Sequence, residues 1–453
     1  MNARDLSTSG TNPACGDADT TVALLANGVR VVTIELPHLA SACVSVFVRT
    51  GSRHESARDN GISHVIEHMA FKGTATRSCQ QVNLDAERLG AEVNAHTDKD
   101  HTAYHMRGLA RHVEPFIAML GDIVQHSTFP EAELERERQV ILHELAEDED
   151  DALSIASRLF DHLSFGTHPL ARPVIGARRN IERFTRADLQ AYVQRQYSGA
   201  NVIVGVAGPV DPARIAGAAQ AAFGAMPRGV EHVVDAPAHH GGIRTHRQTG
   251  CHQTHMVLGF PIATLRDDGH AAAIVAAALF GEGMSSPLMD EIRERRGLVY
   301  YASCTAEVMD VCGQFVIEAS TSPAQLDELV AAVMTLLDSQ AASIDAPGLE
   351  RAKNQIAVRN LGAQERPFRR IEDAAQDLFV FGRVRSRAEI AARLDAVTAA
   401  EVREVFRRML AARPSLAVAG ALRSGARERL IERVMPASGG GIGIGRRLRS
   451  AWR

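Results

Sequence analysis

The sequence predicts an α+β fold of two homologous domains, each a mainly antiparallel β-sheet flanked by helices. Three observations predict it. The chain has 453 residues, more than one hydrophobic core usually sustains. Strand-like runs and a hairpin alternate with helical runs in the first half. The second half repeats spaced motifs of the first. We expect a disordered N-terminal segment at 1–21, a first domain at 22–225, a linker at 226–250, a second domain at 251–425 and a flexible basic tail at 426–453.

The composition is that of an ordinary soluble protein, with 45% apolar and 23% charged residues. A net charge of −4 argues against nucleic-acid binding, which requires a basic face. No apolar run is long enough to span a membrane, and the N-terminus lacks a signal-peptide pattern. Six cysteines without a C-x-x-C pair indicate reduced thiols. We therefore expect a cytoplasmic protein without a membrane span. Cys304 and Cys312 could face each other across a hairpin, although two separate buried thiols are the preferred interpretation.

Strands are predicted at 29–36 and 42–50, where β-branched and apolar residues dominate. The segment 61–73 that follows is predicted to be a helix. Asp59 or Asn60 would cap its start, and Gly73 would end it in a left-handed conformation.

Two histidines on this helix indicate a metal site. His64 and His68 are four residues apart, so both rings project from one face and can bind one tetrahedral zinc. Glu67 lies beside them, and its carboxylate can take a proton from water. The H-x-x-E-H pattern is the inverted zincin signature, in which the glutamate is a base and not a ligand. The alternative, a helix with two surface histidines, is disfavoured because the helix is otherwise apolar.

A third ligand is expected from the helical run at 133–145. Glu137 and Glu144 are seven residues apart, two turns along one helix face. One carboxylate can bind the metal while the other supports it. His143 is an alternative ligand, but it points about 100° away from Glu144 around the helix. The remaining acidic residues are expected to pair with Arg136 and Arg138 on a solvated face.

A hairpin is predicted at 91–106, with its turn at 97–100. His101 and His105 share one face of its second strand. They are candidate metal ligands, but polar strand positions are the preferred interpretation.

The second half repeats the first without its metal residues. Asp59-Asn60-Gly61 matches Asp267-Asp268-Gly269 at an offset of 208, and Leu134-Glu135-Arg136 matches Leu349-Glu350-Arg351 at an offset of 215. In this register His64, Glu67, His68 and Glu144 correspond to Ala272, Val275, Ala276 and Arg359. The sequence therefore predicts a duplicated fold with one active and one degenerate half.

The segment His64–Thr74, with Glu137-Arg138 and Glu144 downstream, resembles the pitrilysin-type zinc metallopeptidases, above all the branch of mitochondrial processing peptidase and its bacterial relatives. Asn94–Thr97, the segment from His168 to Gly176 and a block from Gly281 to Tyr300 extend the resemblance over roughly residues 22–425. It implies one Zn²⁺ per chain, held by His64, His68 and Glu144, with Glu67 as the general base and Glu137 as a supporting carboxylate.

The resemblance also implies how substrate is held. Asn94 and Ala95 match an edge strand to which an extended peptide adds by backbone hydrogen bonds. Arg293 and Tyr300 match a pair that holds the substrate and the tetrahedral intermediate. From the residues alone, Arg293 would be one member of a charged helix end. A two-chain assembly is implied too, a homodimer or a heterodimer with a related subunit.

We therefore expect a zinc endopeptidase that acts on extended or unfolded peptides. One alternative is a non-catalytic partner or scaffold subunit, although relatives of that kind have usually lost the metal residues that this chain retains. Another is a dedicated peptidase in the maturation of a peptide-derived cofactor, which differs only in its substrate.

Overall fold

The computed structural model describes residues 16–434. The disorder predicted for residues 1–15 and 435–453 lies outside the described part. Inside it, β1 (Thr20–Leu24) belongs to the first sheet, and α16 (Ala426–Val434) buries Leu430 in the second core. The prediction of a flexible tail is therefore wrong for residues 426–434, which form a helix. The four-residue spacing of Ala426, Leu430 and Val434 forms an apolar helix face that the basic composition obscured.

The first sheet has six strands in the order β1-β2-β6-β3-β5-β4. All neighbours are antiparallel except β2 and β6. The other strands are β2 (Arg30–Glu35), β3 (Ser41–Val48), β4 (Glu92–Thr97), β5 (Thr102–Leu109) and β6 (Val202–Gly208). The helices of this half are α1 (Ile62–Ala70), α2 (Cys79–Arg88), α3 (Val113–His126), α4 (Glu131–Asp150), α5 (Ala152–Phe165), α6 (Arg178–Ile181), α7 (Arg186–Gln196) and α8 (Pro212–Phe223). One core forms between the sheet and α1, α3 and α8.

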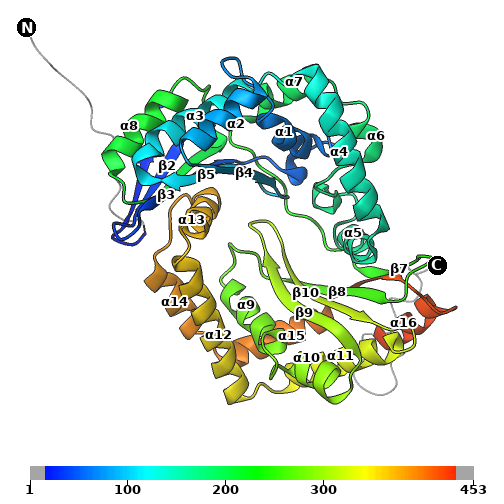
Figure 1. Ribbon diagram of the computed structural model, residues 1–453. Helices are drawn as coiled ribbons and strands as arrows, with labels where there is room; N and C mark the ends of the chain where they lie inside the picture. Colours follow the sequence, from blue (N-terminus) through cyan, green and yellow to red (C-terminus); the bar gives the residue numbers. More distant parts are fainter. Residues whose placement is uncertain (1–15, 435–453) are drawn as a thin grey trace, which may run out of the picture. The chain divides into compact units, whose positions relative to one another are not determined.

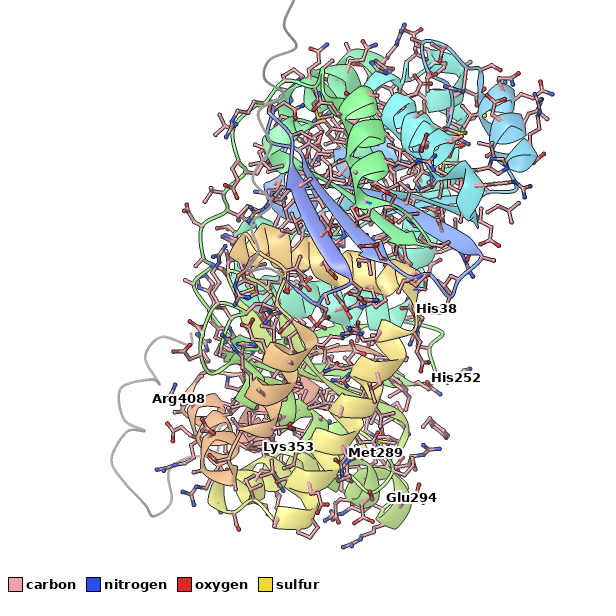
Figure 2. The ribbon with its side chains drawn as sticks, turned by 90° about the vertical axis from the view of Figure 1, so that its left-hand side faces the viewer. His38, His252, Met289, Glu294, Lys353 and Arg408 are labelled. Atoms are coloured by element: carbon pink, nitrogen blue, oxygen red, sulfur yellow. The ribbon has the colours of Figure 1, made fainter. Side chains whose placement is uncertain are left out.

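The second sheet has five strands in the order β7-β11-β8-β10-β9, antiparallel except for β7 and β11. Its strands are β7 (Gly242–Arg247), β8 (Thr254–Ile262), β9 (Val299–Val308), β10 (Gly313–Thr321) and β11 (Ser415–Gly420). The helices are α9 (His270–Gly281), α10 (Pro287–Met289), α11 (Leu326–Ala342), α12 (Ala346–Gln364), α13 (Pro367–Phe381), α14 (Arg387–Asp395) and α15 (Ala399–Ala411). Figure 2 labels Lys353 on α12 and Arg408 on α15, two helices whose apolar sides line the second core.

The two halves share one topology. The strands β2, β6, β3, β5 and β4 follow one another across the first sheet as β7, β11, β8, β10 and β9 do across the second, with the same directions. α1 begins at Ile62 and α9 at His270, 208 positions later, while α4 begins at Glu131 and α12 at Ala346, 215 positions later. These are the offsets of the sequence repeat. The predicted α+β fold of two homologous domains is confirmed.

Each half donates one helix to the other half's sheet. α13 packs Ile371 and Leu378 against the first sheet, and α5 packs Ile155 and Phe160 against the second (Figure 1). The contact is close enough to require glycine, because a Cβ on Gly205 would lie 2.0 Å from Ile371 Cγ2.

The compact units are therefore not consecutive blocks. One comprises the chain up to Glu147 with His168–Ala236 and Ala357–Arg393, and the other comprises Asp148–Thr167, Pro237–Ile356 and the chain from Leu394. The linker predicted at 226–250 includes β7, a strand of the second sheet. The periodicity of helices such as α5 and α13 shows that each has an apolar face. It does not show which sheet covers that face.

Among residues 16–434, no single helix has both the length and the apolar character needed to cross a bilayer. α11 and α12 reach these limits only as a pair, and that pair is bent by 103°.

The cysteines in the described part of the chain form no disulfide bond. Cys304 lies in β9 opposite Ile317, and Cys312 lies just before β10. The two thiols are separate, as predicted, but they are half-buried and not buried.

A half-buried histidine on the α13 side of the first sheet should make stability depend on pH. Burial, followed by the neighbouring His96, lowers the pKa of His105 from 6.5 to about 4. Between these values the unfolded chain binds a proton that the folded chain excludes, so stability is lost as the pH falls through this window. Between pH 7 and pH 5 the free energy of unfolding of wild type should fall by about 1 kcal/mol more than that of His105→Gln. This figure includes a discount for solvent around the partly buried ring. Denaturant unfolding in chelator-containing buffer measures the difference, and equal losses would contradict it.

Candidate metal centre

A buried glutamate caps the N-terminus of α1. Glu55 accepts the backbone N–H of Gly61 at 2.8 Å and that of Ser63 at 2.9 Å. Gly61 is the N-cap residue with a φ of 99°, a conformation that favours glycine. The predicted cap at Asp59 or Asn60 was wrong, because the carboxylate comes from farther upstream. Asn60 instead donates to Glu55.

The end of the helix also differs from the prediction. α1 ends at Ala70, and Gly73 follows with a φ of 134°, outside the left-handed helical conformation expected of a stop. At the start of the helix, Gly61 lies against Gly176, where a Cβ on Gly176 would come within 2.4 Å of the Gly61 Cα. This contact holds the segment before α6 against α1.

Three side chains from α1 and α4 converge. Nε2 of His68 lies 3.6 Å from Oε2 of Glu144, and Nε2 of His64 lies 3.9 Å from the same oxygen. One ligand atom from each residue lies within 4.8 Å of the others. A tetrahedral zinc with bonds of about 2.0–2.1 Å places its ligand atoms about 3.4 Å apart. The two imidazoles and the carboxylate therefore fit zinc in chemistry and in spacing.

The protonation of His64 also suits a ligand. Burial, followed by the nearby His68, lowers the pKa of His64 to about 4. The ring is therefore neutral at physiological pH, which is the form that binds a metal. Its carboxylate partner Glu144 is 41% exposed, so this side of the site is open to solvent.

Glu137 orients the second histidine. Its Oε2 lies 3.1 Å from Nδ1 of His68, and its Oε1 lies 2.6 Å from Nζ of Lys72. An Nδ1–H donated to Glu137 leaves Nε2 of His68 free to bind a metal. Burial opposes ionisation of Glu137, but hydrogen bonds from Lys72 and His68 outweigh it and lower its pKa. Lys72 was missed by the sequence analysis, although its four-residue spacing from His68 was a signal.

Glu67 is half-buried on α1, like His64 and His68. Burial raises its pKa, while hydrogen bonds from the side chain and backbone of Thr97 act in the opposite direction. A raised pKa makes this carboxylate a better proton acceptor than an exposed glutamate. Thr97, at the end of β4, was also missed. No local sequence signal connects a strand end to a helix 30 residues earlier.

Asn94 and Ala95 lie on β4, the edge strand of the first sheet. The backbone N–H of Ala95 donates to Oδ1 of its neighbour Asn94 at 2.8 Å. The strand thus has a backbone donor that bonds a neighbouring side chain on the same strand.

The other candidates lie elsewhere. His143 is 78% exposed, with Nε2 3.5 Å from Oε1 of Glu147, so it does not join the cluster. Arg293 lies in the π-helical turn Asp290–Arg295 of the second unit, and its Nε lies 4.0 Å from Oε1 of Glu294. Tyr300 lies on β9 of that unit and is 73% exposed.

Known proteins are similar to this chain in both sequence and fold. Residues 30–178 match the insulinase family, peptidase family M16, and residues 183–356 match the peptidase M16 inactive domain. An uncharacterized zinc protease of Rickettsia bellii is 31% identical over 88% of this chain and 97% of its own length. One of Streptomyces coelicolor is 30% identical over 90% and 91%.

A peptidase M16 inactive domain from Pseudomonas fluorescens has the same fold, with a TM-score of 0.82 and 21% identity over 89% of this chain and 99% of that chain. The assignment to the processing-peptidase branch stays a prediction. With the inverted zincin helix, the degenerate repeat and these matches together, the chain belongs to the insulinase family of zinc proteases, peptidase family M16.

Proposed function

We propose that this protein is a zinc endopeptidase that hydrolyses extended or unfolded peptides. The observation that carries the proposal is the convergence of His64, His68 and Glu144 beside the half-buried carboxylate of Glu67. The ligand set has three protein donors, as catalytic zinc sites do, with a position left for water or substrate.

The roles of the side chains follow from their surroundings. When bound, zinc would act as a Lewis acid that makes water a nucleophile and polarises the scissile carbonyl. Glu67 takes the proton of the attacking water and then delivers it to the leaving amine. Thr97 holds that carboxylate in position, and Glu137 keeps His68 in the tautomer that binds through Nε2.

The edge strand β4 supplies the proposed peptide site. A peptide lying along it would accept the Ala95 N–H in place of the Asn94 side chain. Backbone hydrogen bonds of this kind require an extended chain and are insensitive to its side chains. We therefore propose unfolded peptides as the natural substrates. On the basis of the composition, we also propose that the protein acts in the cytoplasm.

Metal removal tests the proposal. Dialysis against a chelator should abolish hydrolysis of a quenched fluorescent peptide, and one equivalent of zinc per active site should restore it. The same protein should leave a folded substrate protein intact until that substrate is denatured. Full activity in protein shown to be metal-free would overturn the assignment.

We further propose a homodimer in which each site combines the metal half of one chain with Arg293 and Tyr300 of the other. The exposure of Tyr300 leaves its ring available to a second chain. A closed two-fold assembly forms two such sites. A heterodimer with a related subunit is the alternative outcome.

Mixing two inactive variants tests the shared site. Glu67→Gln and Arg293→Ala homodimers should each be strongly impaired. After free subunit exchange, half the dimers are mixed and half of their sites are intact, so about a quarter of wild-type activity should return. No recovery, under conditions in which exchange is demonstrated by labelled subunits, would contradict the shared site.

A further inference from the structure

A second group of potential metal ligands lies at the turn between β4 and β5. His96, Asp98 and His101 each place one ligand atom within 4.8 Å of the others. The rings of His96 and His101 have centroids 5.4 Å apart and are nearly perpendicular. Nδ1 of His101 lies 3.3 Å from Oδ2 of Asp98.

Turn geometry explains only part of this cluster. Oδ1 of Asp98 accepts the backbone N–H of Asp100 at 2.6 Å and that of His101 at 2.7 Å, as an aspartate in a tight turn commonly does. Oδ2 is not needed for that role. Nε2 of His101 is buried and has no hydrogen-bond partner among residues 16–434. A buried polar nitrogen without a partner is costly, so this nitrogen favours binding a group that satisfies it.

A fourth donor comes from α13. Oε1 of Glu372 lies 3.9 Å from Nε2 of His96, while its Oε2 accepts from Arg369 at 2.7 Å. The arginine fixes the carboxylate and leaves one oxygen directed at the histidine. Figure 1 shows α13 beside the first sheet.

We propose that His96, Asp98 and His101, completed by Glu372, form a second site for a borderline divalent cation such as zinc. Two imidazoles and two carboxylates are a donor set that zinc accepts, and four protein ligands are typical of structural zinc sites. Harder cations such as Mg²⁺ prefer oxygen donors and are disfavoured.

This second site is distinct from the cluster on α1. The ring of His96 lies near Phe368 of α13, and His101 lies against Phe47, in the core between α13 and the sheet. Thr97, the residue after His96, forms hydrogen bonds with Glu67 of α1. Successive side chains of a strand point to opposite faces. A cation here would hold the turn from the face opposite Glu67 and thereby keep Thr97 in place. The inference does not rest on the peptidase proposal.

Zinc stoichiometry tests the second site independently of catalysis. Chelator-treated wild type, equilibrated with Zn²⁺ alone and analysed by mass spectrometry for metal, should retain two zinc ions per chain. The double variant His64→Ala/His68→Ala should retain one. In that background, Asp98→Asn and His101→Gln should each weaken zinc binding at least 10-fold, since each removes a ligand.

Two features make the result decisive. Asp98→Asn keeps the Oδ1 that accepts the two turn amides, so the hairpin should stay folded, as circular dichroism can show. His105→Gln is the matched control, because His105 lies on the neighbouring strand near His96 but outside the ligand group. It should leave the single zinc in place. A double variant without zinc, or zinc that persists after both Asp98→Asn and His101→Gln, would overturn the proposal.

Discussion

Glu67→Gln should retain zinc and lose about 10²–10⁴-fold or more of the peptide-hydrolysis rate. The expected split follows from the surroundings of Glu67. Its side chain bonds Thr97 and is not part of the His64–His68–Glu144 group, so the metal ligands are intact in the variant. Glutamine has nearly the same shape but accepts no proton from water. The loss should appear in kcat and in kcat/KM alike, because the lost interaction belongs to the transition state.

The control for this variant is Glu147→Gln, which removes an exposed carboxylate on α4 that faces His143. Its activity and zinc content should equal those of wild type. Metal analysis beside single-turnover kinetics separates the outcomes. A Glu67→Gln protein that loses its zinc would show that the residue is a ligand, and one with wild-type kcat would remove it as the base.

His64→Ala, His68→Ala and Glu144→Ala should each yield a folded and inactive protein that lacks the zinc of this site. Each substitution takes one of three donors from an open site, whereas the two cores that hold the fold contain none of these side chains. Zinc content by mass spectrometry and the fold by circular dichroism give the two readouts. Glu137→Gln should act more mildly, with a loss of zinc affinity of about 10–100-fold, because it only orients His68.

His143→Ala is the matched control on α4, one residue before Glu144, and should keep both zinc and activity. Glu144→Gln is the sharper variant, since it keeps the shape and removes the charge. Unchanged zinc content in Glu144→Gln would exclude this carboxylate as a ligand. Loss of zinc in His143→Ala would restore the alternative ligand in its place.

The parts of the fold that the sequence predicted depend on local spacing. His64 and His68 share a helix face because four residues make about one turn, and Glu137 and Glu144 share one because seven make about two. The duplication was predictable for a related reason. Two copies of one topology retain matching helix starts, such as Ile62 and His270, even after the metal residues are lost.

Only the tertiary structure decided the contacts between distant segments. Thr97 reaches Glu67 because β4 passes beside α1, and Glu55 caps a helix that begins seven residues later. The exchange of α5 and α13 is of the same kind. Each has an apolar face that either sheet could bury, and the choice depends on close packing such as that of Ile371 on Gly205. Periodicity determines which face of an element is buried, but the partner of that face depends on shape complementarity between segments far apart in the chain.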